Sequence, residues 1–142
     1  MIDGLFKKNA IHFTHANGIP SATYQKFFNY FKADFNLKAI PMIGLNPQYP
    51  VTMSWQYLVE QVIADIEQQF PDQQVIGLGH SFGSLVTLMA AYKRPDLFSQ
   101  LIIMDPPFVI GSKSAIFEAM QKLKLKAVDK ITPAAITLKR KD

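Results

Sequence analysis

The sequence predicts an α/β fold, in which a mostly parallel sheet carries helices on both faces. Short apolar runs rich in β-branched residues alternate with amphipathic stretches of helical spacing, without a repeat or linker before residue 111. Strands separated by helices imply parallel pairing through right-handed crossovers. A chain of 142 residues with 49% hydrophobic and 18% charged residues is large enough to build one buried core.

Four strands are expected, and the first begins the pattern at residues 10–14. The second, at 37–43, contains Pro41, which predicts an edge strand or an early end because proline cannot donate to a sheet ladder. The third and fourth are expected at 74–78 and 101–104, the latter closed by an Asp-Pro-Pro turn.

Three helices are expected between these strands. Ser21 is a candidate N-cap for the first, whose apolar stripe is Tyr24, Phe27, Phe28, Phe31 and Phe35. Thr52 or Ser54 opens the second, which ends at Pro71-Asp72 and has the apolar face Trp55, Leu58, Val59, Val62, Ile66 and Phe70. The third covers residues 84–92 and ends at Arg94-Pro95.

The segment Gly79-His80-Ser81-Phe82-Gly83 reads G-x-S-x-G between an expected strand and an expected helix. This context is typical of a nucleophile elbow, a tight turn that lifts a serine hydroxyl clear of the sheet. The unpaired N–H groups and positive dipole end of the helix then lie beneath that hydroxyl. The alternative is a glycine-rich connection that carries an unremarkable serine.

Composition and charge exclude several classes of function. There are no cysteines, no membrane-length apolar run and no signal-peptide core at the N-terminus, so a cytoplasmic location is expected. Residues 1–112 carry seven Lys or Arg against eight Asp or Glu, whereas residues 113–142 carry eight against three. That basic segment has a single aromatic residue, which argues against a nucleic-acid partner, and its amphipathic helix favours packing on its own domain over a membrane surface.

With strand, elbow and helix in place, residues 10 to about 111 resemble the α/β-hydrolase family. His15-Ala16-Asn17-Gly18 is similar to the H-G-x-G loop of that family, with Ala16 in place of the first glycine. The resemblance implies Ser81 as the nucleophile and the backbone N–H groups of Asn17 and Phe82 as oxyanion donors, or of Ala16 if the loop is shifted by one residue. It implies no cofactor, and the scattered histidines lack the spacing of a metal site.

The resemblance leaves the catalytic base and acid unassigned. In this family the base is a histidine that follows the nucleophile and the acid. His12, His15 and His80 all precede Ser81, and His15 is expected to hold its loop by hydrogen bonds. Asp105, at the end of the fourth strand, is either the acid or, as its Asp-Pro sequence favours, a simple turn.

The resemblance also implies two regions, a core over residues 1–111 and the start of a helical cap or lid over 112–142. Because the last strands of the family have no counterpart, the sequence predicts a truncated or split hydrolase. The fourth strand would then expose an unpaired edge, which predicts self-association or a complementing chain.

Three hypotheses for function follow. The first is a serine hydrolase that acts on small ester or related acyl substrates, incomplete as this chain, with the substrate undefined. The second is a non-catalytic fragment or interaction module that retains the hydrolase fold. The third is a dinucleotide-binding unit, because Gly77, Gly79 and Gly83 approximate G-x-G-x-x-G, but Phe82 occupies the place of the third glycine.

Overall fold

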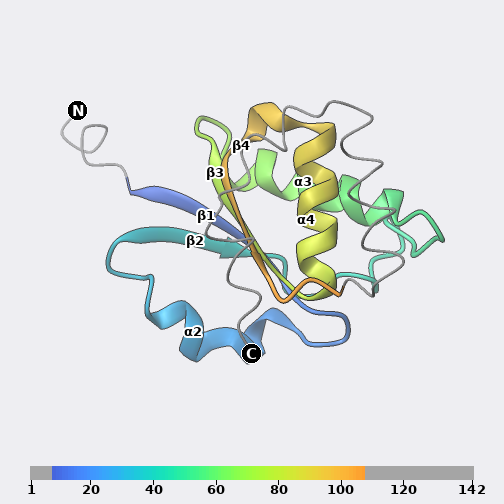
Figure 1. Cartoon of the computed structure of the whole chain (residues 1–142), viewed down its shortest axis with the longest axis horizontal. Coiled ribbons are helices and arrows are strands. Elements are labelled where there is room, and N and C mark those ends of the chain that lie inside the picture. Colours follow the sequence, from blue (N-terminus) through green and yellow to red (C-terminus); the bar gives the residue numbers. More distant parts are fainter. Residues whose placement is uncertain (1–7, 108–142) are drawn as a thin grey trace.

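The computed structural model describes residues 8–107, which form a four-stranded parallel sheet with helices on both faces (Figure 1). The strands lie in the order β2-β1-β3-β4, and every neighbouring pair is parallel. Their bounds are β1 (Asn9–Thr14), β2 (Phe35–Ala39), β3 (Val75–His80) and β4 (Phe98–Met104). The predicted fold class is confirmed.

Two layers of helices enclose this sheet. The helical elements are the 3₁₀ turn η1 (Ser21–Tyr24), α2 (Gln25–Asn29), α3 (Gln56–Gln69), α4 (Phe82–Lys93) and the 3₁₀ turn η2 (Pro95–Leu97). Figure 1 shows α2 on one side of the sheet and α3 with α4 on the other. Within residues 8–107 no helix is long and apolar enough to cross a membrane.

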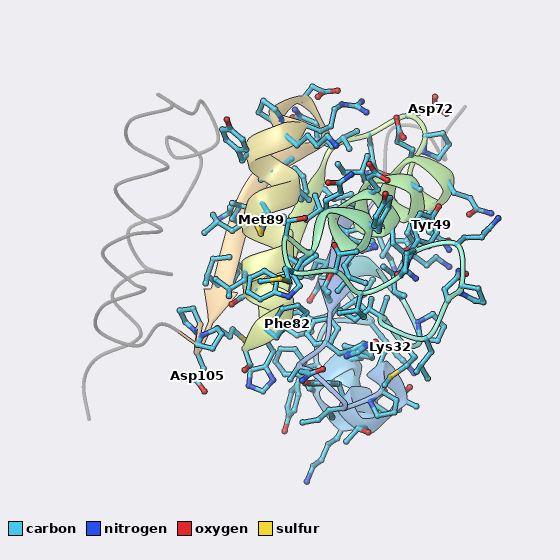
Figure 2. All side chains as sticks on the ribbon, turned by 90° about the vertical axis from the view of Figure 1, so that its right-hand side faces the viewer. Lys32, Tyr49, Asp72, Phe82, Met89 and Asp105 are labelled. Carbon is cyan, nitrogen blue, oxygen red and sulfur yellow. The ribbon has the colours of Figure 1, made fainter. Side chains whose placement is uncertain are left out.

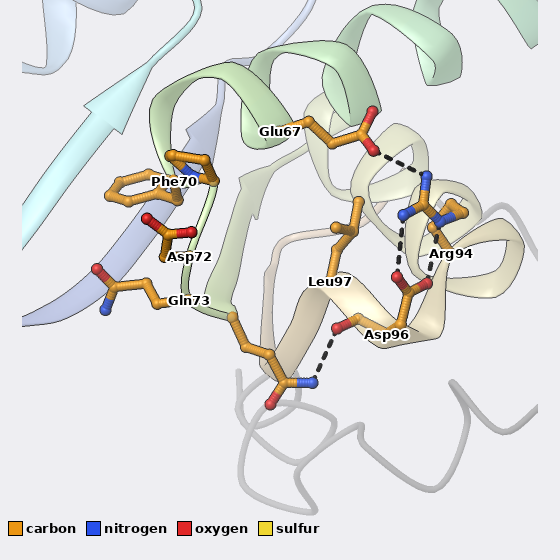
Figure 3. Close-up of a pocket in the computed structure, with 9 residues that line it drawn as sticks. Glu67, Phe70, Asp72, Gln73, Arg94, Asp96 and Leu97 are labelled. Carbon is orange, nitrogen blue, oxygen red and sulfur yellow. Dashed lines mark hydrogen bonds and ion pairs between the residues drawn. The ribbon is translucent and has the colours of Figure 1, made fainter.

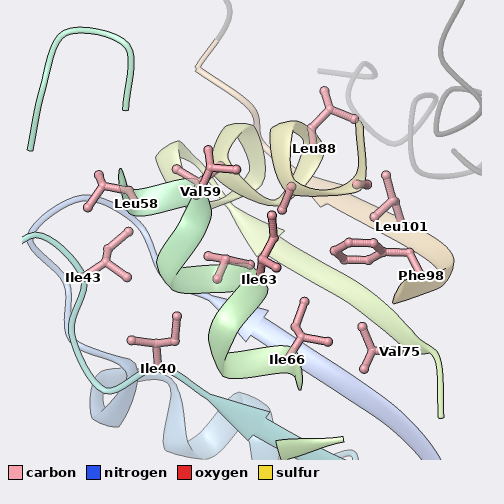
Figure 4. Close-up of a cluster of buried hydrophobic side chains, with 14 of the residues drawn as sticks. Ile40, Ile43, Leu58, Val59, Ile63, Ile66, Val75, Leu88, Phe98 and Leu101 are labelled. Carbon is pink, nitrogen blue, oxygen red and sulfur yellow. The ribbon is translucent and has the colours of Figure 1, made fainter. Parts of the chain in front are cut away.

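The larger core lies between the sheet and the pair α3 and α4 (Figure 4). The apolar face predicted for α3 is buried there at Leu58, Val59, Val62, Ile66 and Phe70, and Trp55 packs against the cluster half-buried. Strands contribute alternate residues to this core, as the period of two for a pleated strand requires.

The smaller core is aromatic and lies on the opposite face of the sheet. Phe13 of β1 is fully buried, and its ring contacts Tyr24 and Phe28 edge-on, with centroids 4.6 and 5.0 Å apart. Phe27 packs tilted against Phe28, and Phe31 continues edge-on between Phe27 and Phe35. The aromatic stripe read from the sequence therefore packs together as predicted, although its residues are spread over η1, α2, the turn after α2 and β2.

The prediction of one long helix capped by Ser21 is wrong. The chain forms a 3₁₀ turn and a short α2 that ends at Asn29, and Pro20 stands at the cap position of η1. The buried Ser21 hydroxyl instead donates to the carbonyl of Ile40 at 2.5 Å. Ser21 thus ties η1 to the segment that follows β2.

The boundaries of β2 also differ from the prediction. β2 begins at Phe35, which the sequence pattern places on the helical stripe, and it ends at Ala39. Its position at the edge of the sheet and its end before Pro41 are as that proline predicts. Phe35 joins the strand because its side chain completes the aromatic core from the sheet side.

The starts of α3 and β4 also differ from the prediction. α3 begins at Gln56, after Trp55 adopts a left-handed conformation with φ 57° and donates its N–H to the carbonyl of Thr52 at 3.0 Å. Thr52 and Ser54 therefore lie in the preceding turn and do not open the helix. β4 begins three residues early, at Phe98, because this fully buried ring extends the strand into the core.

The expected cap or lid over 112–142 lies outside the described residues, so the division at residue 111 stays a prediction. Within residues 8–107, β4 pairs with β3 alone. Self-association or chain complementation through that edge also stays a prediction.

A buried hydrogen bond links the inner strand β1 to α3. His12 of β1 is fully buried, and its Nε2 lies 2.7 Å from Oδ2 of Asp65, whose side chain is 20% exposed. A carboxylate can only accept, so the His12 Nε2–H is the donor. His12 Nδ1 is buried with no partner among the described residues, which makes the Asp65 contact the one that compensates the burial of this ring.

We expect Asp65→Ala to lower the free energy of unfolding by about 1–3 kcal/mol, because it leaves a buried donor unsatisfied. Urea unfolding followed by circular dichroism measures the change. Glu60→Ala is the matched control on the same helix: Glu60 forms an exposed pair with Lys93 at 3.7 Å, and its loss should change stability by less than about 1 kcal/mol. Equal effects of the two substitutions would contradict this account of His12.

Candidate active site

Ser81 joins β3 to α4 in a strained backbone conformation, with φ 53° and ψ −121°. A residue other than glycine held in such a conformation costs about 1–3 kcal/mol, and it persists only where neighbours enforce it. Here the Ser81 N–H donates to the carbonyl of Met104 at 2.9 Å. The Ser81 carbonyl accepts from both the N–H and the hydroxyl of Ser84, at 3.0 and 2.6 Å.

The two glycines of the motif are required because backbone atoms crowd them. A Cβ on Gly83 would lie 2.2 Å from the carbonyl oxygen of Thr14 and 2.4 Å from that of His15. A Cβ on Gly79 would lie 2.5 Å from the Cα of Ser84. The first turn of α4 therefore rests directly on the end of β1, as a sharp strand-to-helix turn demands.

The sheet register brings the loop after β1 to the same edge as the elbow. Thr14 of β1 pairs with Gly79 of β3, so the segment 15–18 leaves the sheet beside Ser81. Phe82 is the first residue of α4, where a backbone N–H has no partner within the helix. Ser81 and Phe82 are half-buried, and Asn17 is exposed.

His15 holds that loop, as its position in the sequence predicts. Its ring is fully buried, and Nε2 accepts a hydrogen bond from the Ile43 N–H at 2.8 Å. Nδ1 therefore carries the proton and donates it to the carbonyl of Ala16 at 2.6 Å. Both ring nitrogens are occupied, so His15 fixes two loops and is not available to Ser81 as a base.

The other two histidines are also engaged. His12 is buried against Asp65, and Nδ1 of His80 lies 2.8 Å from the hydroxyl of Tyr24. Asp105 forms an exposed bend with φ 46° directly after β4. Because His80 pairs with Met104, Asp105 follows β4 at the same level as Ser81 follows β3, and Figure 2 shows it at the same end of the sheet as Phe82.

The sequence did not reveal three contacts that support the site. Ser84 braces the Ser81 carbonyl, Tyr24 bridges Ala16 and His80, and Trp55 packs edge-on against Phe82 with ring centroids 5.1 Å apart. One signal was available for Tyr24, which carries the only hydroxyl in a stripe otherwise made of phenylalanine. No comparable signal marked Trp55, which lies 27 positions from Phe82 in the sequence.

An open hollow of about 590 Å³ lies at the amino ends of the strands, opposite to Ser81 (Figure 3). Its lining includes Gln74 and Leu97, which precede β3 and β4, so the six residues of β3 separate it from Ser81 by roughly 20 Å. Arg94 closes one wall by hydrogen bonds to Asp96 at 2.9 and 3.0 Å and to Glu67 at 3.1 Å. These bonds, chiefly those to Asp96, raise the pKa of Arg94 above its ordinary value.

The Arg94 contacts join the ends of α3 and α4 to η2. We therefore interpret the side chains around the hollow as structural contacts between these elements. Within residues 8–107 no three His, Asp or Glu side chains gather to hold a metal ion. The carboxyl ends of the strands around Ser81 are thus the strongest candidate for an active site.

Comparison with known proteins finds relatives in both sequence and structure. The sequence model of the family described as "Serine aminopeptidase, S33" matches residues 46–141. A type I acyl-CoA thioesterase of Penicillium brevicompactum is 29% identical over 133 residues, covering 81% of this chain and 30% of that protein. The monoglyceride lipase of Mus musculus is 32% identical over 57 residues, covering 40% of this chain and 19% of the lipase.

Solved structures share the fold. The monoacylglycerol lipase of Paleococcus ferrophilus superimposes with a TM-score of 0.58 at 20% identity, over 83% of this chain and 49% of the lipase. The chain therefore spans less than half the length of each of these three proteins.

We expect Gly83→Ala to lower the free energy of unfolding by about 3 kcal/mol or more, because the added methyl group meets immovable backbone. Gly18→Ala is the matched control, since Gly18 has open space around it and only its φ of 75° opposes a side chain. That control should cost about 1–2 kcal/mol. Thermal and urea unfolding measure both, and a Gly83→Ala protein as stable as the Gly18→Ala protein would contradict the close approach.

Proposed function

Because the chain belongs to the serine aminopeptidase S33 family of α/β-hydrolases, we propose that Ser81 is the nucleophile of a hydrolase acting on ester or related acyl substrates. The observation that carries this proposal is the strained conformation of Ser81, with φ 53°, between β3 and the first turn of α4. Strain of this kind concentrates at functional sites, where surrounding contacts maintain it.

The arrangement supports a two-step acyl transfer. The Ser81 Oγ adds to the substrate carbonyl carbon while its proton passes to a base, and the carbonyl oxygen becomes an oxyanion. The N–H groups of Phe82 and Asn17 donate to that oxygen, and each such donor is worth about 3 kcal/mol in the transition state. Collapse expels the alcohol or thiol with a proton, and water then releases the acid from the acyl-serine.

We assign no base for this reaction among residues 8–107. The sequence has three histidines, and His12, His15 and His80 each make the hydrogen bonds described above. None of these hydrogen bonds is with Ser81, so none of the three histidines is assigned as the group that accepts the Ser81 proton. Asp105 remains a candidate for the acid, because it lies at the same sheet edge as Ser81.

An aromatic pair that includes the residue directly after the elbow serine is consistent with an apolar acyl group. Trp55 packs edge-on against Phe82, the residue that offers an oxyanion donor, and both side chains lie half-buried against the larger core. The names of two relatives, a thioesterase of acyl-CoA and a monoglyceride lipase, both describe acyl esters or thioesters. These two observations support an acyl substrate for this chain.

A non-catalytic module is the second candidate function. The engagement of all three histidines favours it, because a serine without a base keeps a hydroxyl pKa far above neutral. The two candidates differ in whether Ser81 can be activated when a base is supplied.

We expect a fluorophosphonate to label Ser81 slowly in the isolated chain and faster as imidazole is added, because imidazole substitutes for the missing general base. Intact mass and peptide mapping give the extent and place of labelling. The residual rate without imidazole reflects the oxyanion hole, which alone supports catalysis above the rate in water.

Ser81→Ala is the control and should abolish the adduct in a folded protein. Ser99, which donates to the Val75 carbonyl near the opposite edge of the sheet, serves as an internal control that stays unlabelled. A folded chain that forms no Ser81 adduct at any imidazole concentration would favour the non-catalytic module.

A further inference from the structure

Tyr24 lies between the two parts of the proposed oxyanion hole. Its hydroxyl accepts a hydrogen bond from the Ala16 N–H at 3.1 Å, in the loop after β1. The same oxygen lies 2.8 Å from Nδ1 of His80, the residue before Ser81. One phenol thus connects the loop that carries one donor to the turn that carries the other.

The ring of Tyr24 is held in place by three aromatic neighbours. It packs edge-on against Phe13 of the central strand, with centroids 4.6 Å apart and an interplanar angle of 61°. It also contacts the His80 ring edge-on at 5.7 Å and stacks near Phe28 at 6.1 Å. The hydroxyl therefore has a fixed position relative to the sheet.

The hydrogen bond from the Ala16 N–H to Tyr24 determines which backbone N–H of the loop can still donate to a substrate oxygen. The Ala16 carbonyl accepts from His15 Nδ1 at 2.6 Å and from the Ile19 N–H at 3.1 Å, and Tyr24 occupies the Ala16 N–H. In a trans peptide the next N–H points opposite to the carbonyl, so the Asn17 N–H faces away from His15 and Ile19. Among the described residues, the Asn17 N–H makes no hydrogen bond.

The contact with His80 points to a tautomer. Among the described residues, Nδ1 of His80 is the one acceptor that hydrogen-bonds the Tyr24 hydroxyl, so we assign the phenol proton to this contact and the ring proton of a neutral His80 to Nε2. The hydrogen bonds form one chain from Ala16 through Tyr24 to His80, with each donor matched to one acceptor.

We propose that Tyr24 is a positioning residue that fixes where the loop of residues 15–18 lies relative to the elbow serine. By taking the Ala16 N–H, it selects Asn17 as the second oxyanion donor, and through His80 it fixes the distance between that donor and Phe82. This inference rests on the proposed function, because it assigns Tyr24 a role in the same site.

The test compares Tyr24→Phe with Tyr30→Phe by nuclear magnetic resonance of ¹⁵N-labelled protein. Tyr30 is 78% exposed and offers the same chemical change without the contacts. In the unmodified chain, the Ala16 amide should exchange slowly and the His80 nitrogens should show the Nε2–H tautomer. Tyr24→Phe should speed Ala16 exchange about tenfold and abolish the tautomer preference, whereas Tyr30→Phe should change neither.

The second readout is the kinetics of fluorophosphonate labelling in the presence of imidazole. We expect Tyr24→Phe to lower the maximal rate at Ser81 about tenfold, because a misplaced donor weakens transition-state stabilisation. The half-saturating probe concentration should stay within about twofold, since the loss is specific to the transition state. Tyr30→Phe should match the unmodified chain in both parameters.

The outcomes separate this inference from the function on which it rests. An unmodified chain without a Ser81 adduct overturns both, although the resonance data then still report the hydrogen bonds of Tyr24. Labelling of the unmodified chain with an unchanged rate in Tyr24→Phe overturns the positioning role alone. Resonances of Ala16 and His80 that do not respond to Tyr24→Phe overturn the hydrogen-bonded bridge itself.

Discussion

The contact between the first turn of α4 and the end of β1 is the constraint on which the rest of the site depends. Gly83 lies so close to the carbonyls of Thr14 and His15 that no side chain fits between them. This approach sets the start of α4 directly after β3 and leaves a single residue, Ser81, to make the turn. The strain at Ser81 follows from that geometry, and its hydrogen bonds to Met104 and Ser84 hold it there.

Buried polar groups extend this constraint outward. His15 joins the loop after β1 to Ile43, and Tyr24 joins the same loop to His80, so the Ala16 peptide is held on both sides. Below them His12 and Asp65 fix α3 to the central strand. The apolar cores on the two faces supply cohesion, whereas these few polar contacts determine where backbone N–H groups point.

The sequence predicts the fold class, the succession of strands along the chain and the elbow. Each of these depends on a local pattern: β-branched runs, helical spacing and glycine at two crowded positions. It failed where tertiary contacts override local preference. Phe35 has helical spacing yet enters β2 to complete the aromatic core, and Ser21 gives its hydroxyl to Ile40. The roles of Tyr24 and Trp55 were not predictable, since each acts on a residue distant in the sequence.

In the proposed reaction, N–H groups from two strand ends converge on an oxygen bound at Ser81. A crystal structure of the chain phosphonylated at Ser81 would show this convergence in the position of the phosphoryl oxygen. We predict that this oxygen lies about 2.7–3.1 Å from the backbone nitrogens of both Phe82 and Asn17. A phosphoryl oxygen that faces solvent, or that displaces Tyr24 to reach the Ala16 nitrogen, would contradict the account.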